Sequence, residues 1–358
     1  MSSTPFDVIA MGRIGVDLYP QQSGVGLADV ETFAKSLGGS PANVAVAAAR
    51  LGDRSAVVTK VGDDPFGAYV RRALWRFGVD DRYVGTDRRL RTPITFCELH
   101  PPDHFPLLFY REPSAPDLQL TDADLDLEAV RAARILWTTG TGLSQEPSRT
   151  TTLTALRERR EADPAATTIH DLDHRPMFWD DPAAATRWAR EALRHATIAV
   201  GNREEVAVAV GTGEPDAAAD ALLELGLEVA IVKRGPAGTL VATRERRWEV
   251  PPSPTAVVCG LGAGDAFGGA LCHGLLAGWP VDRCVRLASA AGAFVAGRLA
   301  CADAMPDRAE LLAFAGAALA GDGDGDGDGD ASGAAPDDAA ARGAAAAPGT
   351  AGPEEAAA

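Results

Sequence analysis

The chain has 358 residues, with 34 Lys and Arg against 50 Asp and Glu, and a formal net charge of −16. This acidic balance argues against nucleic acid as a main partner, because phosphate binding needs clustered cationic surface. Apolar residues make up 46% of the chain and charged residues 23%, which is typical of a globular protein with a large core. No stretch approaches the roughly 18 apolar residues that cross a bilayer, and the amino-terminal residues lack a signal-peptide pattern. We therefore expect a cytoplasmic protein with no membrane partner.

Short runs of β-branched residues alternate with stretches rich in Ala and Leu along most of the chain. The pattern predicts strands at residues 7–11, 55–61, 134–138, 167–171, 197–200 and 229–233. It predicts helices at residues 41–51, 66–77, 148–160, 182–195, 216–225, 266–276 and 282–299. This order predicts an α/β fold, with a doubly wound, mostly parallel sheet and helices on both faces, as one main domain over residues 6–319.

Two stretches interrupt the alternation, at about residues 13–35 and 90–112. In the second, TPITFCEL and PLLFYRE flank a Pro-Pro-Asp sequence that favours a turn, which indicates a β-hairpin. Strands inserted into a βαβ series do not easily join the main sheet, so we predict a small β lid beside it. Phe96, Leu107 and Phe109 alternate along the hairpin, and an apolar face made by them is compatible with a homodimer through the lid.

The carboxyl-terminal residues, 320–358, begin GDGDGDGDGD after an Ala and hold almost nothing apolar larger than alanine. Such a segment cannot offset the entropy of ordering, so we expect a disordered acidic tail. Alternating Asp and Gly suggest a calcium loop, but no Glu closes a twelve-residue frame, which favours a solvated tail.

The sequence CGLGAGDAFGGAL at residues 259–271 follows a strand-like TAVV and opens a helix. Its first three glycines let backbone N–H groups converge, and the start of a helix adds positive potential, so an anion site is expected there. Asp265 follows at the same helix start, where we expect its charge to be stabilised and its pKa to be low.

This turn matches neither the dinucleotide fingerprint, whose last position would be Asp265, nor a phosphate loop ending in Gly-Lys. A nest of glycine amides beside a carboxylate suits phosphoryl transfer, in which the amides steady the moving group and the carboxylate accepts the hydroxyl proton. The alternative is a plain glycine-rich helix start with Asp265 as its N-cap.

A second informative segment, LGGSPANVAVAAARLG, covers residues 37–52. Ser40 as cap and Pro41 in the first turn predict the start of a helix. Asn43 lies near that start, facing the same mouth as Gly39, and either caps the loop or contacts a ligand hydroxyl.

The double-glycine helix with Asn43 and the GAGD turn are similar to the two signatures of the ribokinase, or PfkB, family of carbohydrate kinases. Asp17 in GRIGVDLYP, NREE at residues 202–205 and VKRGPAGTL at residues 232–240 add to the resemblance, which covers about residues 6–319. It implies a ribokinase-like fold and transfer of phosphate from ATP to a sugar hydroxyl. One departure is Cys259, Gly260 and Leu261, where many members have Asp-Thr-Thr, so hydroxyl contacts there are not expected.

The resemblance implies a role for individual residues. Asp265 is the implied base. The backbone N–H groups implied to form the anion hole belong to Gly262, Ala263 and Gly264. The residues implied to hold sugar hydroxyls are Asp17, Gly39 and Asn43.

The resemblance also implies a nucleotide and metal site. Asn202 and Glu205 would lie near Mg²⁺ and the phosphates of ATP, with Glu205 as an indirect metal contact. The residues implied to lie along the nucleotide are Lys233, Gly235 and Gly238. NREE is alternatively an acidic helix start and Lys233 an exposed strand end. A monovalent cation, K⁺, would use backbone carbonyls near the GAGD turn and residues 290–301.

Three further phrases, GRIGVDLYPQQSGVGL, LLFYREPSAPDLQL and HDLDHRPMFWD, resemble the 5-dehydro-2-deoxygluconokinase branch of the family, which serves bacterial myo-inositol breakdown. The resemblance implies a sugar acid as acceptor. We expect Arg111 and Arg175 to bind its carboxylate, because planar guanidinium groups bind carboxylate in a fork, with Arg13 as a third candidate. Tyr110 either contacts the sugar or packs within the lid.

Two other interpretations remain open at this point. The acceptor is alternatively 2-keto-3-deoxygluconate or a neutral sugar such as fructose or ribose. The other is a catalytically silent sugar-binding protein on the same fold, against which the intact GAGD turn with Asp265 argues.

Overall fold

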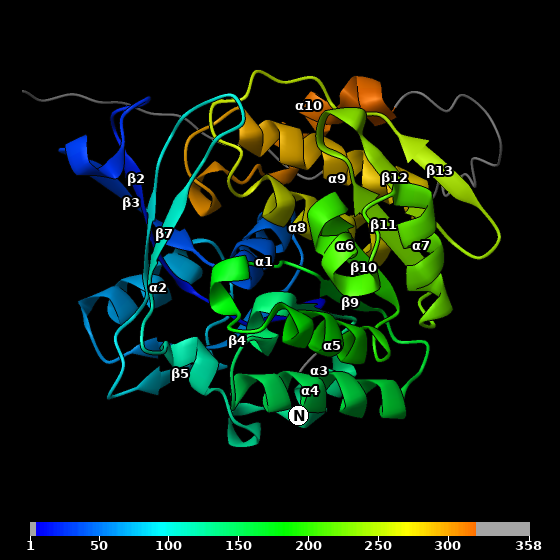
Figure 1. The fold of residues 1–358 in the computed structure, drawn as a ribbon, viewed down its shortest axis with the longest axis horizontal. Coiled ribbons are helices and arrows are strands. Elements are labelled where there is room, and N and C mark those ends of the chain that lie inside the picture. The colour runs from blue at the N-terminus through cyan, green and yellow to red at the C-terminus, as the bar shows by residue number, and fades with distance from the viewer. Residues whose placement is uncertain (1–4, 320–358) are drawn as a thin grey trace, which may run out of the picture. The chain divides into compact units, whose positions relative to one another are not determined.

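The computed structural model describes residues 5–319 and arranges their strands in two separate sheets (Figure 1). The larger sheet contains, side by side, β13 (Arg247–Val250), β12 (Thr239–Ala242), β11 (Val229–Lys233), β10 (Ile198–Asn202), β9 (Thr168–Asp171), β8 (Ile135–Thr139), β1 (Val8–Met11), β4 (Ser55–Gly62) and β5 (Val84–Asp87). Its strands are parallel except for β12 and β13, which run antiparallel to their neighbours. The predicted acidic tail, residues 320–358, lies outside the described residues.

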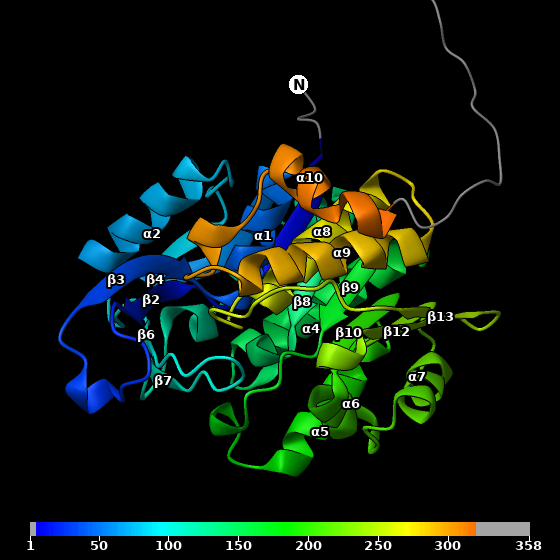
Figure 2. The same ribbon diagram turned by 90° about the horizontal axis from the view of Figure 1, so that it is seen from above.

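Helices cover both faces of the large sheet. They are α1 (Ser40–Arg50), α2 (Pro65–Arg76), α3 (Leu127–Ala132), α4 (Ser148–Ala162), α5 (Pro182–Leu193), α6 (Arg203–Val210), α7 (Pro215–Glu224), α8 (Ala263–Leu276), α9 (Val281–Ala296) and α10 (Arg308–Leu319). Figure 2 shows α1, α8, α9 and α10 on one side of the sheet and α5, α6 and α7 on the other. The predicted doubly wound α/β fold is therefore confirmed.

The alternation of side chains along β1 explains how one strand serves two cores. Val8 and Ala10 face the core formed with α1, α8 and α9, whereas Ile9 and Met11 face the core formed with α3 and α4. Successive side chains of a strand point to opposite faces, so a strand buried on both sides is apolar at every position. This is why the central strands were readable from short apolar runs.

Most of the elements that sequence reasoning missed are short or lie at an edge; the exception is α10, a helix of twelve residues. Helices α3 and α6 have six and eight residues, too few for a clear helical period. β13 carries charged residues and lies at the end of the sheet order. The predicted strand at residues 255–258 is wrong, because these residues form neither a helix nor a strand and lead irregularly into α8.

Glycines let α1 and α8 approach closely. A Cβ at Gly269 would lie 2.3 Å from the Cβ of Ala47, and one at Gly268 would lie 2.7 Å from the ring of Trp137. Overpacking of this kind typically costs about 1–3 kcal/mol, so these positions require glycine. The close approach brings the amino-terminal ends of the two helices to the same place.

The smaller sheet has the strand order β3 (Phe33–Gly38), β2 (Gly15–Pro20), β6 (Ile94–Cys97) and β7 (Leu107–Tyr110). These strands come from the two stretches that interrupt the αβ alternation, so the predicted small β lid is confirmed, and β3 continues three residues beyond the expected boundary. Figure 1 shows β2, β3 and β7 beside the large sheet.

Register fixes which lid residues face inward. Thr95 pairs with Phe109, and Phe96 with Leu108, so Phe96 lies on the face opposite to Phe109. The expectation that Phe96, Leu107 and Phe109 share one apolar face is therefore wrong. Phe96 instead packs edge-on against Phe33 and Tyr110.

No helix within residues 5–319 is both long enough and apolar enough to span a bilayer.

Candidate active site

A cavity of about 430 Å³ lies between the lid and the carboxyl ends of the central strands. Ligands of open α/β sheets bind at this edge, where the strand order reverses. Most of the predicted site residues line it: Arg13, Asp17, Gly39, Asn43, Arg175, Asn202, Glu205, Lys233, Gly235, Gly262, Ala263, Gly264 and Asp265. The structure therefore brings together residues from six separate segments of the sequence.

The glycine turn forms the start of α8. Gly262 is the N-cap with a φ of 80°, and a Cβ there would lie 2.7 Å from the Sγ of Cys301. The first backbone N–H groups of a helix have no partner within the helix, so those of Ala263 and Gly264 remain available to an anion. Asp265 is the third helical residue and does not cap, so the alternative of an N-cap aspartate is wrong.

Asp265 lies where α1 and α8 meet. Its Oδ2 accepts a hydrogen bond of 2.8 Å from the Nδ2 of Asn43. Burial raises the pKa of Asp265, although hydrogen bonds from Asn43 and Ser40 oppose the rise. The expected low pKa is wrong, because desolvation by the surrounding elements outweighs the helix start. A carboxylate with a raised pKa is a better proton acceptor.

Ser40 has a different position from the one predicted. Gly39, with a φ of 105°, is the N-cap of α1, and Ser40 is its first helical residue. A Cβ at Gly39 would lie 2.5 Å from the carbonyl oxygen of Arg13. Gly38 has an equally specific reason, since a Cβ there would lie 2.0 Å from the Oδ1 of Asp17. Gly38 thus makes room for the carboxylate of Asp17, and Gly39 for the backbone of Arg13.

Asp17 reaches the cavity from the inner face of the lid strand β2 and is 8% exposed. Burial raises the pKa of Asp17 to about 6, with Arg13 lowering it and Asp265 raising it. The hydroxyl of Tyr19 donates to Asp17 Oδ2 at 3.5 Å, and Thr95 also bonds to this carboxyl group. The lid therefore supplies an acidic group to the same cavity as Asp265.

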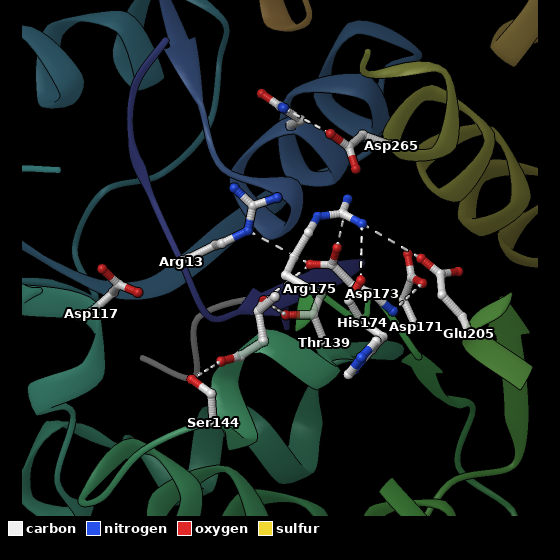
Figure 3. Close-up of polar contacts among 12 residues, drawn as sticks. Arg13, Asp117, Thr139, Ser144, Asp171, Asp173, His174, Arg175, Glu205 and Asp265 are labelled. Carbon is white, nitrogen blue, oxygen red and sulfur yellow. Dashed lines mark hydrogen bonds and ion pairs between the residues drawn. The ribbon is translucent and has the colours of Figure 1, made fainter. Parts of the chain in front are cut away.

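Two arginines and two carboxylates follow the ends of β1 and β9. Asp173 lies between the guanidinium groups of Arg13 and Arg175, on the side of them away from Asp265 (Figure 3). Burial raises the pKa of Asp171 to about 7, and the positive charge of Lys233 opposes this rise. Sequence reasoning did not select either aspartate for the site. Asp171 is the last residue of the buried strand β9 and Asp173 follows two residues later, and this position at the carboxyl edge of the sheet is the signal that could have found them.

Asn202 and Glu205 form the start of α6 as well as part of the cavity wall. Asn202 Oδ1 accepts from the N–H groups of Glu204 and Glu205, each at 2.9 Å, and Glu205 Oε2 accepts from Asn202 N–H at 2.7 Å. This is a capping box, so the structural interpretation of NREE holds alongside the predicted position near a ligand.

Lys233 ends β11 and lines two cavities. Although burial alone would lower it, the carboxylates of Asp171, Glu205 and Asp265 raise the pKa of Lys233. Its ammonium group therefore stays charged among acidic neighbours at the mouth of the glycine turn.

The second cavity, of about 670 Å³, adjoins the first at the turn. Both are lined by Lys233, Gly235, Gly260, Ala263 and Gly264. Gly238, the remaining predicted nucleotide residue, lines only the second cavity of the two, together with Phe267 and Ala293. An elongated ligand with one apolar end and one anionic end fits this arrangement.

Arg111 and Tyr110 differ from expectation, because neither lines the first cavity. Arg111 is buried, with its Nη2 2.8 Å from Asp117 Oδ2 and its guanidinium over the ring of Phe178. Tyr110 lies on the outer face of the lid with 63% of its surface exposed. Phe109, one residue before Tyr110, and its cross-strand partner Thr95 line the cavity instead.

A metal ion would find few protein ligands here. Across residues 5–319 no group of three or more His, Cys, Asp and Glu is placed to hold one. Mg²⁺ in kinases usually binds one or two carboxylates together with phosphates and water. Glu205, and Asp171 behind it, fit such a limited contribution.

Comparisons with known proteins agree with this geometry. The model of the pfkB family of carbohydrate kinases matches residues 6–308. A protein of Photobacterium profundum named 5-dehydro-2-deoxygluconokinase is 34% identical over 317 residues, covering 87% of this chain and 95% of its own.

Two solved structures are also similar. A double-mutant fructokinase of Vibrio cholerae, bound to fructose, ADP and potassium ion, is 27% identical, covers 88% of this chain and 99% of its own, and has a TM-score of 0.77. A putative ribokinase II of E. coli, 22% identical over 86% of this chain and 98% of its own, has a TM-score of 0.79 and shows the fold alone. The chain belongs to the pfkB family of carbohydrate kinases.

Proposed function

We propose that this kinase transfers the γ-phosphoryl group of ATP to the C6 hydroxyl of 5-dehydro-2-deoxy-D-gluconate, a step of myo-inositol degradation. The observation that carries the proposal is the position of Asp265, which lines the cavity with two arginines and directly follows Ala263 and Gly264, the residues of the turn that also line the apolar cavity. The relative from Photobacterium profundum, named for this reaction, supports the choice of acceptor.

The proposed chemistry uses groups on both sides of the turn. The acceptor hydroxyl gives its proton to the carboxylate of Asp265 while its oxygen forms a bond to the γ-phosphorus and the bond to ADP breaks. The N–H groups of Gly262, Ala263 and Gly264 stabilise the charge on the moving phosphoryl group. The raised pKa of Asp265, caused by burial, supports its role as base.

A sugar acid is favoured over a neutral sugar by one arginine edge in the first cavity. Arg13 and Arg175 both line it, and the side chain of Arg13 is only 12% exposed. Asp173 pairs with Arg13 at Nε alone, so a neutral ketose leaves the two Nη groups of Arg13 without a charged partner, whereas a carboxylate binds such an edge in a fork. The same observation leaves 2-keto-3-deoxygluconate as the second candidate acceptor and disfavours fructose and ribose.

The metal ions are part of the proposal. Mg²⁺ bound to the phosphates would neutralise their charge, and Glu205, with Asn202 beside it in the cavity wall, is the residue proposed to contact it indirectly. K⁺ is proposed near the turn, in line with the potassium-bound fructokinase. A cytoplasmic location, where ATP is supplied, completes this part of the proposal.

A homodimer through the lid is also proposed. Leu108 and Tyr110 are 48% and 63% exposed on the outer face of the lid, beside Phe33 and Phe96. Exposed apolar groups on one sheet face favour association with a second copy.

A direct test measures ADP formation and ³¹P spectra of the products with a panel of sugar acids and ketoses. We expect 5-dehydro-2-deoxygluconate to give the highest kcat/KM and a phosphate monoester at C6. Preferred turnover of fructose or ribose would contradict the sugar-acid assignment. Ligand binding without ATP consumption would instead favour the silent binding protein.

A further inference from the structure

Asp173 has two features that nothing in the reaction scheme above uses. It is 3% exposed, and it has a φ of 26°, one of only two non-glycine residues with positive φ among residues 5–319. Its backbone N–H donates to Asp171 Oδ1 at 3.2 Å, which fixes this turn after β9. A residue that keeps an uncommon backbone conformation at the wall of a cavity indicates that its side chain has a function there.

Both carboxylate oxygens of Asp173 are engaged. Oδ1 lies 2.9 Å from Arg175 Nη2, and Oδ2 lies 3.6 Å from Arg13 Nε. Thr141 Oγ1 donates to the same Oδ2 at 3.0 Å. The carboxylate thus joins two guanidinium groups at the carboxyl edge of the large sheet, one after β1 and one after β9 (Figure 3).

The contact leaves one edge of Arg13 unused. Asp173 approaches the Nε atom of Arg13. The Nη1 and Nη2 atoms of Arg13 make no hydrogen bond or ion pair with any described residue. Phe109 of the lid packs over this guanidinium, with 6.0 Å between the Cζ atom and the ring centroid. The two Nη groups form the edge that binds a carboxylate in a fork.

The ion pairs of the two arginines are unequal. Although burial opposes it, Arg175, Arg13 and the Thr141 hydroxyl lower the pKa of Asp173, so it stays ionised. Arg175 has a second carboxylate beside it, because its Nη1 lies 3.7 Å from Glu205 Oε1. Arg13 has only the contact of 3.6 Å at Nε, so its Nη edge is the part of the pair that a ligand carboxylate can reach.

We propose that Asp173 is a positioning residue that holds Arg13 and Arg175 as a two-part receptor for the carboxylate of the acceptor. The proposal rests on the proposed function, because it takes the acceptor to be a sugar acid. It differs from a role in which Asp173 only neutralises the arginines. Neutralisation weakens anion binding, whereas positioning strengthens it, so the two roles predict opposite effects of removing the charge.

The test compares two probes, 5-dehydro-2-deoxygluconate and its carboxamide, which has the same shape without the charge. Dissociation constants are measured by calorimetry for wild type and for Asp173→Asn. We expect wild type to prefer the acid, and the variant to lose roughly tenfold or more of its affinity for the acid with little change for the amide. An increased affinity for the acid, or equal effects on both probes, would overturn the proposal.

Asp117→Asn is the matched control. Asp117 is also a buried carboxylate paired with an arginine, Arg111 at 2.8 Å, but it does not line the cavity. We expect it to change affinity for acid and amide equally, if at all. A selective loss for the acid in Asp117→Asn as large as in Asp173→Asn would show a general effect of breaking buried pairs and would contradict the proposal.

Two further variants keep the test decisive. If Asp173→Asn does not fold, Thr141→Val removes the hydrogen bond that fixes the carboxylate and should give a smaller loss in the same direction. In an Arg13→Ala background, Asp173→Asn should add less than its effect on wild type, because it acts partly through Arg13. Full additivity contradicts the proposal. A wild type that binds acid and amide equally contradicts the sugar-acid function itself.

Discussion

The two cavities that meet at the glycine turn differ in chemistry. The first is lined by arginines and carboxylates on the lid side, and the second by Phe267, Ala293 and a proline-containing segment on the side of α8 and α9. The difference separates recognition of a polar acceptor from recognition of an apolar ring. The backbone N–H groups of Ala263 and Gly264 lie where the two cavities meet, and Asp265 follows them directly. The reaction therefore needs a ligand in each cavity.

Removing the carboxylate that lies between the two cavities should have the strongest effect on activity. Asp265→Asn should lower kcat by about 10² to 10⁴, because the acceptor hydroxyl loses its proton acceptor. Both KM values should change little, since the walls of the two cavities are intact. Steady-state kinetics with thermal unfolding as the folding control checks this. Near-normal turnover would remove Asp265 from the mechanism.

Two variants, one in each cavity, test whether the acceptor and ATP bind at separate sites. Arg175→Ala should raise KM for the sugar acid about tenfold, because a charged hydrogen bond is lost, and leave KM for ATP nearly unchanged. Ala293→Leu should do the reverse by filling the second cavity, which Ala293 lines. Both KM values are measured for each variant. Equal changes in both KM values in either variant would show that the two cavities are not separate sites.

The carboxylates of the first cavity predict a fall in kcat/KM at low pH, which is the acidic limb of the pH profile. Burial raises the pKa of Asp17 to about 6, with Arg13 opposing and Asp265 reinforcing the rise. Below that pH the group is protonated and accepts fewer hydrogen bonds from the sugar, so kcat/KM should fall as the pH drops from about 7 to about 5. In Asp17→Asn this limb should shift, and what remains belongs to Asp265 and Asp171. An unchanged profile in the variant would rule out Asp17.

The smallest expected effect concerns the two faces of the lid. Tyr110→Ala should change KM for the acceptor by less than about twofold, because Tyr110 is 63% exposed on the outer face. Phe109→Ala should raise that KM several-fold, because Phe109 lines the cavity and packs on Arg13. A larger effect from Tyr110 than from Phe109 would mean that the lid turns its other face to the ligand.

The central part of this site could be read from the sequence because its signals are local. Gly39, Asn43 and the GAGD turn lie within single helix starts, where residue type and spacing determine geometry. The raised pKa of Asp265 could not be read there, because its cause is burial by elements distant in the sequence. The sequence therefore predicted that these residues lie together, but the pKa that it predicted for Asp265 was wrong.

The lid residues were harder to predict, because successive side chains of a strand point to opposite faces of the sheet. Tyr110 and Arg111 were chosen and Phe109 was not, although one residue of register separates inside from outside. Arg111 forms a buried ion pair with Asp117, six residues later in the chain, and the local sequence contains no signal for this pair. Pairing of strands and of buried charges depends on tertiary contacts that motif spacing does not contain.

The glycine contact between α1 and α8 separates two properties of the proton acceptor. Asn43 and Asp265 are carried by two helices that touch along their glycines, so the hydrogen bond between them depends on helix packing and not on the lid strands. Burial raises the pKa of Asp265, and the charge of Arg13 opposes the rise, so the acidity of Asp265 is linked to the arginine side of the cavity. A substitution at Arg13 would therefore alter the acidity of the base while leaving its position unchanged.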